Sequence, residues 1–249
     1  LNVEKTIEHA EGLLKEGLHG AFFFGSTGQS QLISLSEKKE LISSIATNKN
    51  RKNFYLGVGC NSLLDTINLV KYSMEYKFDT FLLMPPAYYK NNTDKGIYLF
   101  FKSIIKENLK IKIILYNFEK LSGYLFSEKI IKKLKKDFPK NIIGVKDSSY
   151  NLYEKLRLDD FLIFPGSESK LLKGLELGCA GCISAITNVT HSLARKVFDD
   201  FQKSNPQTVN EKLISVRQTF DNFNLISSLH SFLSENDKMY LNLLPPLIP

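Results

Sequence analysis

Several features that often reveal where a protein works are missing from this 249-residue sequence. It has only three cysteines, an odd number without the spacing of a secreted disulfide scaffold, which indicates a reducing compartment. It has no apolar run near the roughly 20 residues that span a bilayer, and no signal peptide opens it. We therefore expect a cytoplasmic protein without a membrane partner.

Motifs for metals, nucleotides and nucleic acids are also missing. Cys179 and Cys182 form a CxxC pair, but a metal site needs two further ligands and a redox pair usually opens a helix. No GxGxxG motif or P-loop follows the first apolar run. The formal net charge of +7 is spread among acidic residues, and no nucleic-acid-binding motif accompanies it. We expect no metal, no organic cofactor and no nucleic-acid partner.

The sequence does contain a series of short, continuous apolar runs, which are typical of buried parallel strands. Segments with helical periodicity separate them, and some carry start signals, such as the capping box formed by Ser34 and Glu37. The runs occupy residues 20–25, 54–59, 80–86, 111–117, 142–147, 162–168 and 181–186. This repeated strand and helix pattern predicts either an open doubly wound sheet or a closed barrel.

Polar and small residues follow the runs at their carboxyl ends, which favours the barrel. In a barrel these ends converge on one mouth, where active sites are built. The missing nucleotide motif argues against the open sheet. From about Thr190 onward the chain has only helical patterns. We therefore predict an α/β protein with a (β/α)8 TIM barrel over residues 1–189 and a helical segment over residues 190–249 that packs on it.

Lys146 directly follows an apolar run, where an ammonium group loses its hydration. A desolvated lysine can form a Schiff base with a ketone, which then accepts electrons from a breaking carbon–carbon bond. Nearby strand ends offer Tyr116 as a proton shuttle and the hydroxyls of Ser26 and Thr27 as relays. The backbone N–H groups of the GSTG turn can hold a carboxylate. The set suits a 2-keto acid, although each member alone also fits an ordinary structural role.

Five motifs in one order resemble those of the dihydrodipicolinate synthase and N-acetylneuraminate lyase family of class I aldolases. They are GSTGQS, PPAYYKNNTDKG, YNFEKLSG, GVKDSS and GCAGCISAITN, and the resemblance covers the whole chain. It implies that Lys146 forms the Schiff base and that Tyr116 shuttles protons. It also implies that Ser26 and Thr27 bind the carboxylate and relay protons, and that Tyr89 serves a neighbouring subunit. By the same resemblance the protein would be a homotetramer built from dimers.

The resemblance implies one more strand than the seven predicted runs. Family members begin with a strand before the segment that Leu1 matches, and they usually continue with a helix after the stretch that LLPPLIP matches. A barrel cannot close with seven of these strands. We therefore expect that the natural protein has a first strand that this sequence lacks.

The residues that select the second substrate depart from the synthase pattern. Synthases of the family carry an arginine at the place of Leu121, and an aliphatic side chain cannot clamp a carboxylate. Leucine here is more similar to the N-acetylneuraminate lyases, whereas GSES resembles the GSDS pattern of 2-keto-3-deoxy sugar acid aldolases. We expect the polar groups after the last two runs to bind a polyhydroxy tail, namely Gly166, Glu168, Ser169 and Ser184.

The sequence thus predicts a pyruvate-dependent lyase that reversibly cleaves a 2-keto acid to pyruvate and an aldehyde. The 2-keto acid would be a 2-keto-3-deoxy sugar acid or a compound like N-acetylneuraminate. Dihydrodipicolinate synthase, which condenses pyruvate with aspartate semialdehyde, is one alternative, and a keto-deoxy sugar acid dehydratase is another. A binding protein that keeps the keto-acid pocket without catalysis is the third.

Overall fold

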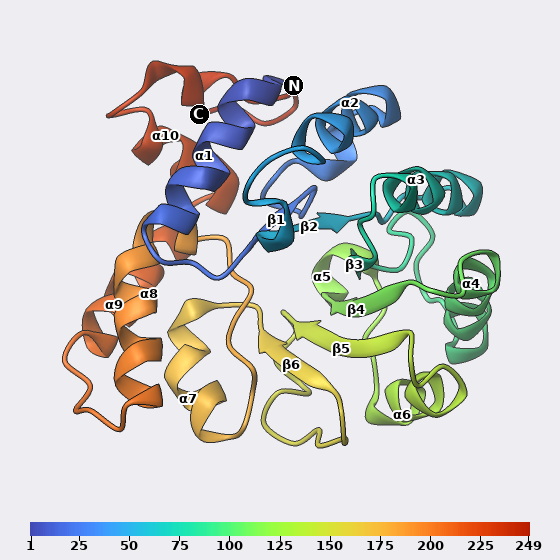
Figure 1. Cartoon of the computed structure of the whole chain (residues 1–249). Coiled ribbons are helices and arrows are strands. Elements are labelled where there is room, and N and C mark those ends of the chain that lie inside the picture. Colours follow the sequence, from blue (N-terminus) through green and yellow to red (C-terminus); the bar gives the residue numbers. More distant parts are fainter.

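The structure is a computed structural model that describes residues 1–249. Its six parallel strands form one curled sheet in chain order, with helices around it (Figure 1). The strands are β1 (Ala21–Phe23), β2 (Phe54–Gly57), β3 (Thr80–Leu83), β4 (Lys112–Asn117), β5 (Ile142–Asp147) and β6 (Leu162–Pro165). The predicted α/β class is confirmed, while the closed barrel of eight strands stays a prediction.

The predicted strand over residues 181–186 is wrong, because this segment forms no regular strand. It still lies along β6, since the N–H groups of Ala180 and Ile183 donate to the carbonyls of Ile163 and Pro165 at 3.0 and 3.1 Å. Between these two bonds Gly181 has a φ of +146°, which a side chain rarely allows and which interrupts the ladder. The segment therefore follows the sheet edge without joining it fully.

Helices connect the strands and follow the last of them. The α-helices are α1 (Val3–Lys15), α2 (Leu35–Ile45), α3 (Leu63–Glu75), α4 (Asp94–Glu107), α5 (Glu119–Ser122), α6 (Glu128–Asp137), α7 (Leu171–Glu176), α8 (Thr187–Gln202), α9 (Asn210–Asp221) and α10 (Leu225–Leu233). Short 3-10 helices are η1 (Ser30–Leu32), η2 (Arg51–Asn53), η3 (Glu168–Lys170) and η4 (Lys238–Leu241). The predicted capping box at Ser34 is confirmed, because its side chain and that of Glu37 cap each other's N–H groups at the start of α2.

The main core fills the space between the sheet and its surrounding helices. Leu41 of α2, Phe81 of β3 and Phe101 of α4 are fully buried there. Each such side chain contributes about 1.5–3 kcal/mol relative to an exposed one. This packing fixes the strands so that their carboxyl ends gather along one side of the sheet.

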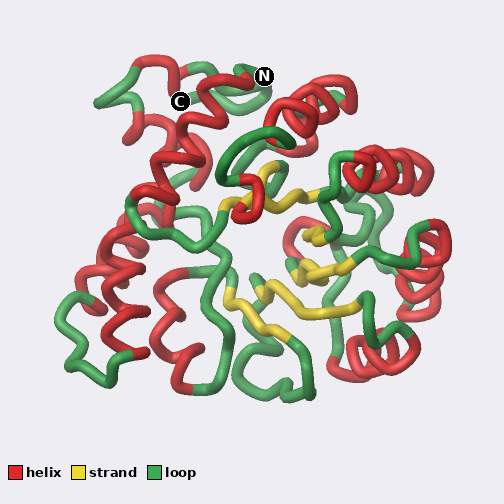
Figure 2. Tube along the Cα trace, viewed as in Figure 1, coloured by secondary structure: helices red, strands yellow, loops and turns green.

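The last three α-helices form a separate layer beside the sheet. Helix α8 packs on α7 and α9, and α9 also contacts η3, which follows β6. Figure 2 shows that the two ends of the chain lie near each other, at α1 and beyond α10. No helix in the structure has both the length and the apolar character that a bilayer span requires. The C-terminal helices thus lie against elements that follow the strand ends.

Candidate active site

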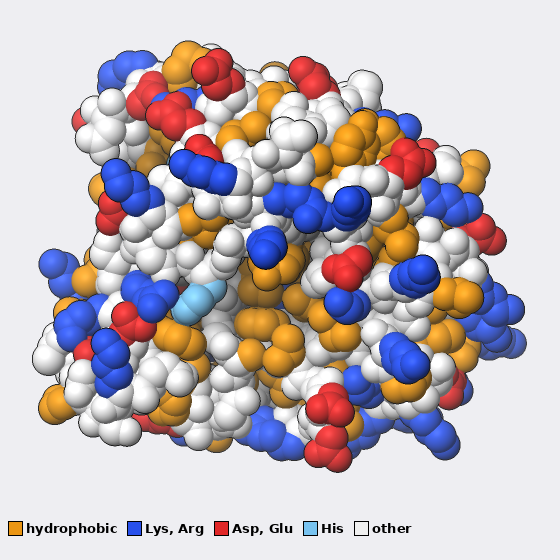
Figure 3. Space-filling model, in the orientation of Figure 1, with side chains coloured by type: hydrophobic (Ala, Val, Ile, Leu, Met, Phe, Trp, Pro, Cys, Tyr) orange, Lys and Arg blue, Asp and Glu red, His pale blue; other side chains and the backbone are white.

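The inner face of the sheet borders a cavity of about 1000 Å³. Apolar side chains from the strands line much of it, including Phe22, Leu82 and Phe164. Figure 3 shows this face hollowed near its centre, with hydrophobic side chains in the hollow. Four of the predicted site residues line the cavity, namely Ser26, Thr27, Lys146 and Ser184.

Lys146 lies in β5, in register with Tyr116 of β4 on one side and Phe164 of β6 on the other. The residue is only 9% exposed. Its Nζ lies 4.2 Å from the centroid of the Tyr116 ring. Such a contact stabilises a desolvated ammonium by about 2 kcal/mol. Lys146 forms no ion pair with a carboxylate, so an aromatic face rather than an anion accompanies this buried cation.

Tyr116 is 5% exposed, and its hydroxyl lies 3.3 Å from the Oγ of Ser26. Burial alone would raise the pKa of Tyr116. The positive charge of Lys146 and the polar contacts with Ser26 and Ser148 outweigh burial and lower this pKa below its ordinary value. The phenol of Tyr116 therefore releases its proton more readily than that of a free tyrosine.

The GSTG turn follows β1 and is closed by two backbone bonds. The N–H of Gln29 donates to the carbonyl of Ser26 at 3.1 Å, and that of Ser30 donates to Gly25 at 3.3 Å. The N–H groups of Ser26, Thr27 and Gly28 donate no hydrogen bond in the structure. Free N–H groups gathered in one turn are a binding site for an anion such as a carboxylate.

Backbone strain marks both ends of this turn. Phe24 and Gln29 have φ values of 60° and 54°, in the left-handed region that non-glycine residues rarely adopt. The carbonyl oxygen of Phe24 lies where a Cβ on Gly57 would be, at 2.3 Å, so glycine is required at that place in β2. The strained turn therefore packs directly against β2, where its Phe24 carbonyl contacts Gly57.

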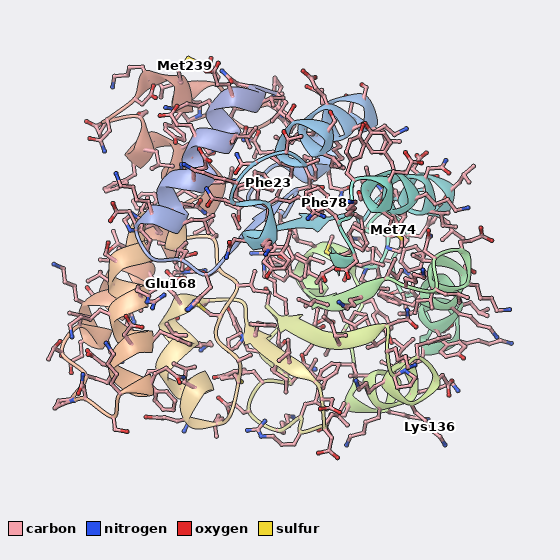
Figure 4. All side chains as sticks on the ribbon, in the orientation of Figure 1. Phe23, Met74, Phe78, Lys136, Glu168 and Met239 are labelled. Carbon is pink, nitrogen blue, oxygen red and sulfur yellow. The ribbon has the colours of Figure 1, made fainter.

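A cluster of polar side chains follows β6. Glu168 is fully buried and accepts hydrogen bonds from the hydroxyl of Ser184 and, at 3.4 Å, from Nη1 of Arg217. It is the first residue of η3 and pairs with Arg217 of α9, and Figure 4 labels it. Its Oε1 has no hydrogen-bond partner. Glu168 therefore lies behind Ser184, which alone among the predicted tail-binding residues lines the cavity.

The other two predicted tail-binding residues have local partners. A Cβ on Gly166 would lie 2.0 Å from the Oγ of Ser148, so only glycine fits beside the end of β5. The hydroxyl of Ser169 lies 2.9 Å from that of Ser167. Neither Gly166 nor Ser169 lines the cavity.

Tyr89 lies far out on the loop after β3 and is 76% exposed. Its ring packs edge to face on that of Tyr88, which is equally exposed, with the centroids 5.2 Å apart. Tyr89 does not line the cavity of its own chain. Its role in a neighbouring subunit stays a prediction.

Two cations near the strand ends were not expected from the sequence. Arg217 of α9 bonds both Glu168 and Asp221. Nε of Arg217 lies 2.8 Å from Oδ1 of Asp221. The Nζ of Lys90 donates to the carbonyl of Leu121 at 2.9 Å. Gly123, with a φ of 70°, makes room for the aliphatic part of Lys90. No periodicity or motif links these residues, so only the folded chain brings them together.

Cys179 and Cys182 are free thiols. Burial raises the pKa of Cys182 to about 12, so its thiol stays protonated near neutral pH. No group of three or more His, Cys, Asp or Glu side chains is arranged to hold a metal ion.

Comparisons with known proteins show the family and the fold of this chain. The model of the Dihydrodipicolinate synthetase family matches residues 1–249. The chain is 33% identical to the 2-dehydro-3-deoxy-D-gluconate/2-dehydro-3-deoxy-phosphogluconate aldolase of Picrophilus torridus, covering 72% of this chain and 68% of that protein. It is 29% identical to the 4-hydroxy-tetrahydrodipicolinate synthase of Acetivibrio thermocellus, over 80% and 70% of the two chains. The crystal structure of dihydrodipicolinate synthase from Agrobacterium tumefaciens has the same fold, with a TM-score of 0.89, 24% identity, and 99% and 87% of the chains covered.

Proposed function

The chain belongs to the dihydrodipicolinate synthetase family and is a lyase, and from this premise we propose that it cleaves a 2-keto acid to pyruvate and an aldehyde through a Schiff base on Lys146. The favoured substrate is a 2-keto-3-deoxy sugar acid or a compound like N-acetylneuraminate. The observation that supports this most strongly is the buried, carboxylate-free ammonium of Lys146, 4.2 Å from the Tyr116 ring beside the cavity.

In the first half of the reaction the ammonium of Lys146 gives up a proton to solvent, and the resulting amine attacks the ketone at C2. Tyr116, with its lowered pKa, donates a proton to the departing hydroxyl, which leaves as water when the imine forms. Ser26 accepts or supplies that proton through its contact with Tyr116 at 3.3 Å. The free N–H groups of Ser26, Thr27 and Gly28 hold the substrate carboxylate.

In the second half the protonated imine accepts the electron pair of the C3–C4 bond. A base removes the proton of the C4 hydroxyl, the bond breaks, and the aldehyde leaves. The resulting enamine takes a proton at C3, and water hydrolyses the imine to release pyruvate and the free lysine. Tyr116 is the group of this chain best placed to move these protons, because it contacts both Lys146 and Ser26.

Ser184 gives the cavity a polar contact for the part of the substrate beyond C4. Its hydroxyl hydrogen is committed to Glu168 and one lone pair accepts from Nη1 of Arg217 at 3.5 Å, so one lone pair is left to accept a hydrogen bond. A sugar hydroxyl is a donor that fits this requirement. The proposed preference for a polyhydroxy tail therefore rests on Ser184, with Glu168 and Arg217 holding it in place.

One observation favours dihydrodipicolinate synthase as the second candidate. The ammonium of Lys90 lies at the carbonyl of Leu121, the place where family synthases carry an arginine. The side chain is exposed and is anchored only by that bond, so it is free to turn toward an acidic aldehyde. Lys90 would then bind the carboxylate of aspartate semialdehyde as a point charge, without the bidentate geometry of arginine.

One assay with three substrates separates these candidates. The enzyme is mixed with 2-keto-3-deoxygluconate, with N-acetylneuraminate, or with pyruvate and aspartate semialdehyde, and pyruvate is followed by reduction to lactate. Pyruvate release from either sugar acid supports the proposal. Pyruvate consumption that depends on aspartate semialdehyde would replace it with the synthase. Loss of water from the sugar acid without pyruvate release would identify a dehydratase.

We also propose that a further strand completes the sheet as a (β/α)8 barrel. Strand β1 pairs only with β2, and residues 180–186 follow the opposite edge at β6 with two hydrogen bonds, so the sheet is not closed between these two edges. The exposed Tyr88 and Tyr89 are the proposed tetramer contact. Light scattering of the wild type and of Tyr89→Ala tests this contact, and an unchanged mass of four subunits in the variant would contradict it.

A further inference from the structure

The side chain of Gln29 ties the GSTG turn to the C-terminal segment. Its Oε1 accepts a hydrogen bond from the N–H of Leu244 at 2.9 Å. Its Nε2 lies 3.3 Å from the Nε2 of His230 in α10. These partners are 215 and 201 residues away along the chain. The residue that ends the strained turn is thus anchored by a distant part of the molecule.

The partners of His230 determine which ring nitrogen carries its hydrogen. Its Nδ1 lies 2.7 Å from the backbone carbonyl of Tyr240, which can only accept, so Nδ1 carries the hydrogen. In the neutral ring Nε2 then has a lone pair. The Leu244 N–H fixes the Gln29 amide with its oxygen toward Leu244 and its NH2 group toward His230. Gln29 therefore donates to a neutral His230.

The hydrogen-bond chain continues to the other side of the cavity. The hydroxyl of Tyr240 lies 2.7 Å from Nδ1 of His9, and Nε2 of His9 lies 2.8 Å from Oδ1 of Asn188. Asn188 donates its NH2 group to the carbonyl of Ala185, so its oxygen must face His9. His9 thus carries its hydrogen on Nε2, the opposite form from His230. Ala185 follows Ser184, so the chain links the segments that carry Ser26 and Ser184.

We propose that Gln29 is a positioning residue that holds the GSTG turn in its strained form through the neutral Nδ1–H form of His230. The inference rests on the proposed function, in which Ser26 on this turn acts with Tyr116. Gln29 lines the cavity, and in this proposal it acts by keeping the Ser26 hydroxyl 3.3 Å from Tyr116.

Protonation of His230 would remove one of the two bonds of this anchor. The ring would then present an N–H at Nε2 to the NH2 group of Gln29, and two donors cannot bond. The titratable groups around His230 come from α1 and η4. Tyr240 packs edge to face on its ring, His9 interacts with it through charge, and Lys5 lies beyond them over the Tyr240 ring, paired with Asp237. Gln29 therefore keeps both of its side-chain bonds only while His230 is neutral.

Three variants test this inference through the rate at which pyruvate is trapped on the enzyme by cyanoborohydride, measured from pH 5.5 to 8. Gln29→Met keeps the size of the side chain and loses both bonds, and we expect trapping to slow by about 3- to 10-fold. Gln29→Glu accepts from Leu244 as before but bonds only a protonated His230. Its rate relative to wild type should therefore rise as the pH falls. Gln31→Met is the matched control, because Gln31 bonds the carbonyl of Gly59 on the other side, and it should change the rate by less than Gln29→Met.

Two results would overturn the inference while leaving the proposed function intact. One is a Gln29→Met enzyme that traps pyruvate at the wild-type rate. The other is a Gln29→Glu enzyme whose rate relative to wild type does not change with pH. Nitrogen NMR of the histidines gives an independent check, because it shows which ring nitrogen carries the hydrogen. A neutral His230 with its hydrogen on Nε2 would also contradict the inference. A wild-type enzyme that traps no pyruvate at any pH would remove the proposed function itself, and the role of the turn with it.

Discussion

Two buried charges near neighbouring strand ends have opposite surroundings. Lys146, at the end of β5, has an aromatic ring and a cavity beside it and no carboxylate. Glu168, just after β6, has Arg217 and Ser184 on one oxygen and lies outside the cavity. A buried charge that is paired contributes to the arrangement of the fold, whereas one left without a counter-ion is available for chemistry.

The strand geometry explains why Lys146 lacks a counter-ion although an aspartate follows it. Successive side chains of a strand point to opposite faces, so Asp147 faces away from Lys146. Asp147 is fully buried and accepts from Asn117 at 2.8 Å and from the N–H groups of Tyr150, Leu152 and Tyr153 at 2.9 Å each. Its charge is used to fold the loop after β5, and the cation on the other face remains unpaired.

Replacing Lys146 should have the largest effect on activity. In Lys146→Ala no amine can form the imine, so cleavage of the keto acid should fall by more than about 1000-fold. Lys170→Ala is the matched control, because Lys170 also lies over a tyrosine ring, with its Nζ 4.9 Å from the centroid of Tyr150. Steady-state kinetics of both variants provide the test. If both variants lost the same amount of activity, the lack of a counter-ion at Lys146 would not explain its role in catalysis.

Removing the proton shuttle should have the next largest effect. Tyr116→Phe keeps the ring beneath Lys146 and loses the hydroxyl near Ser26, so kcat should fall by about 100- to 10,000-fold with little change in folding. Tyr72→Phe is the control, because the hydroxyl of Tyr72 hydrogen-bonds only the hydroxyl of Tyr76. A Tyr116→Phe enzyme with normal kcat would assign the proton transfers to another group.

Breaking the paired charge should affect stability rather than imine formation. Arg217→Met leaves Glu168 buried without its cation and should lower the free energy of unfolding by about 3–5 kcal/mol, measured by urea unfolding. The double variant Arg217→Met with Glu168→Gln removes both charges and should recover much of that loss. If the double variant is no more stable than the single one, the pairing of Glu168 is not what makes Arg217 important.

The smallest expected effect is the pH dependence that comes from His9. Burial lowers the pKa of His9 in the folded protein, while the unfolded chain titrates near the ordinary value of about 6.5. Below about pH 6.5 the unfolded state therefore binds more protons, and the free energy of unfolding should fall by at most about 1.4 kcal/mol per pH unit. In His9→Gln this contribution should disappear. Urea unfolding at several pH values compares the two, and parallel curves would contradict the prediction.

The sequence predicted the parts of the site that depend on strand order. Apolar runs locate the six strands, and parallel strands bring their carboxyl ends together, which places Tyr116 beside Lys146 and Ser26. The prediction of a strand over residues 181–186 was wrong because the positive φ of Gly181 interrupts the pairing. The amino-acid composition of the segment does not encode that angle.

The contacts that could not be predicted join segments without a shared period or motif. Arg217 reaches Glu168 across 49 residues, and Gln29 reaches His230 across 201. These contacts depend on how the C-terminal helices pack beside the strand ends, which is a property of the whole fold. Sequence reasoning therefore found the groups proposed for the chemistry and missed the groups that hold them in position.

The central claim is that Lys146 is a nucleophile, and intact-mass spectrometry after incubation with pyruvate and borohydride tests it most directly. We predict a single pyruvate-sized adduct on the wild type, located at Lys146 by peptide mapping, and none on Lys146→Ala. A folded wild-type protein that gains no adduct, or gains it on another lysine, would contradict the account.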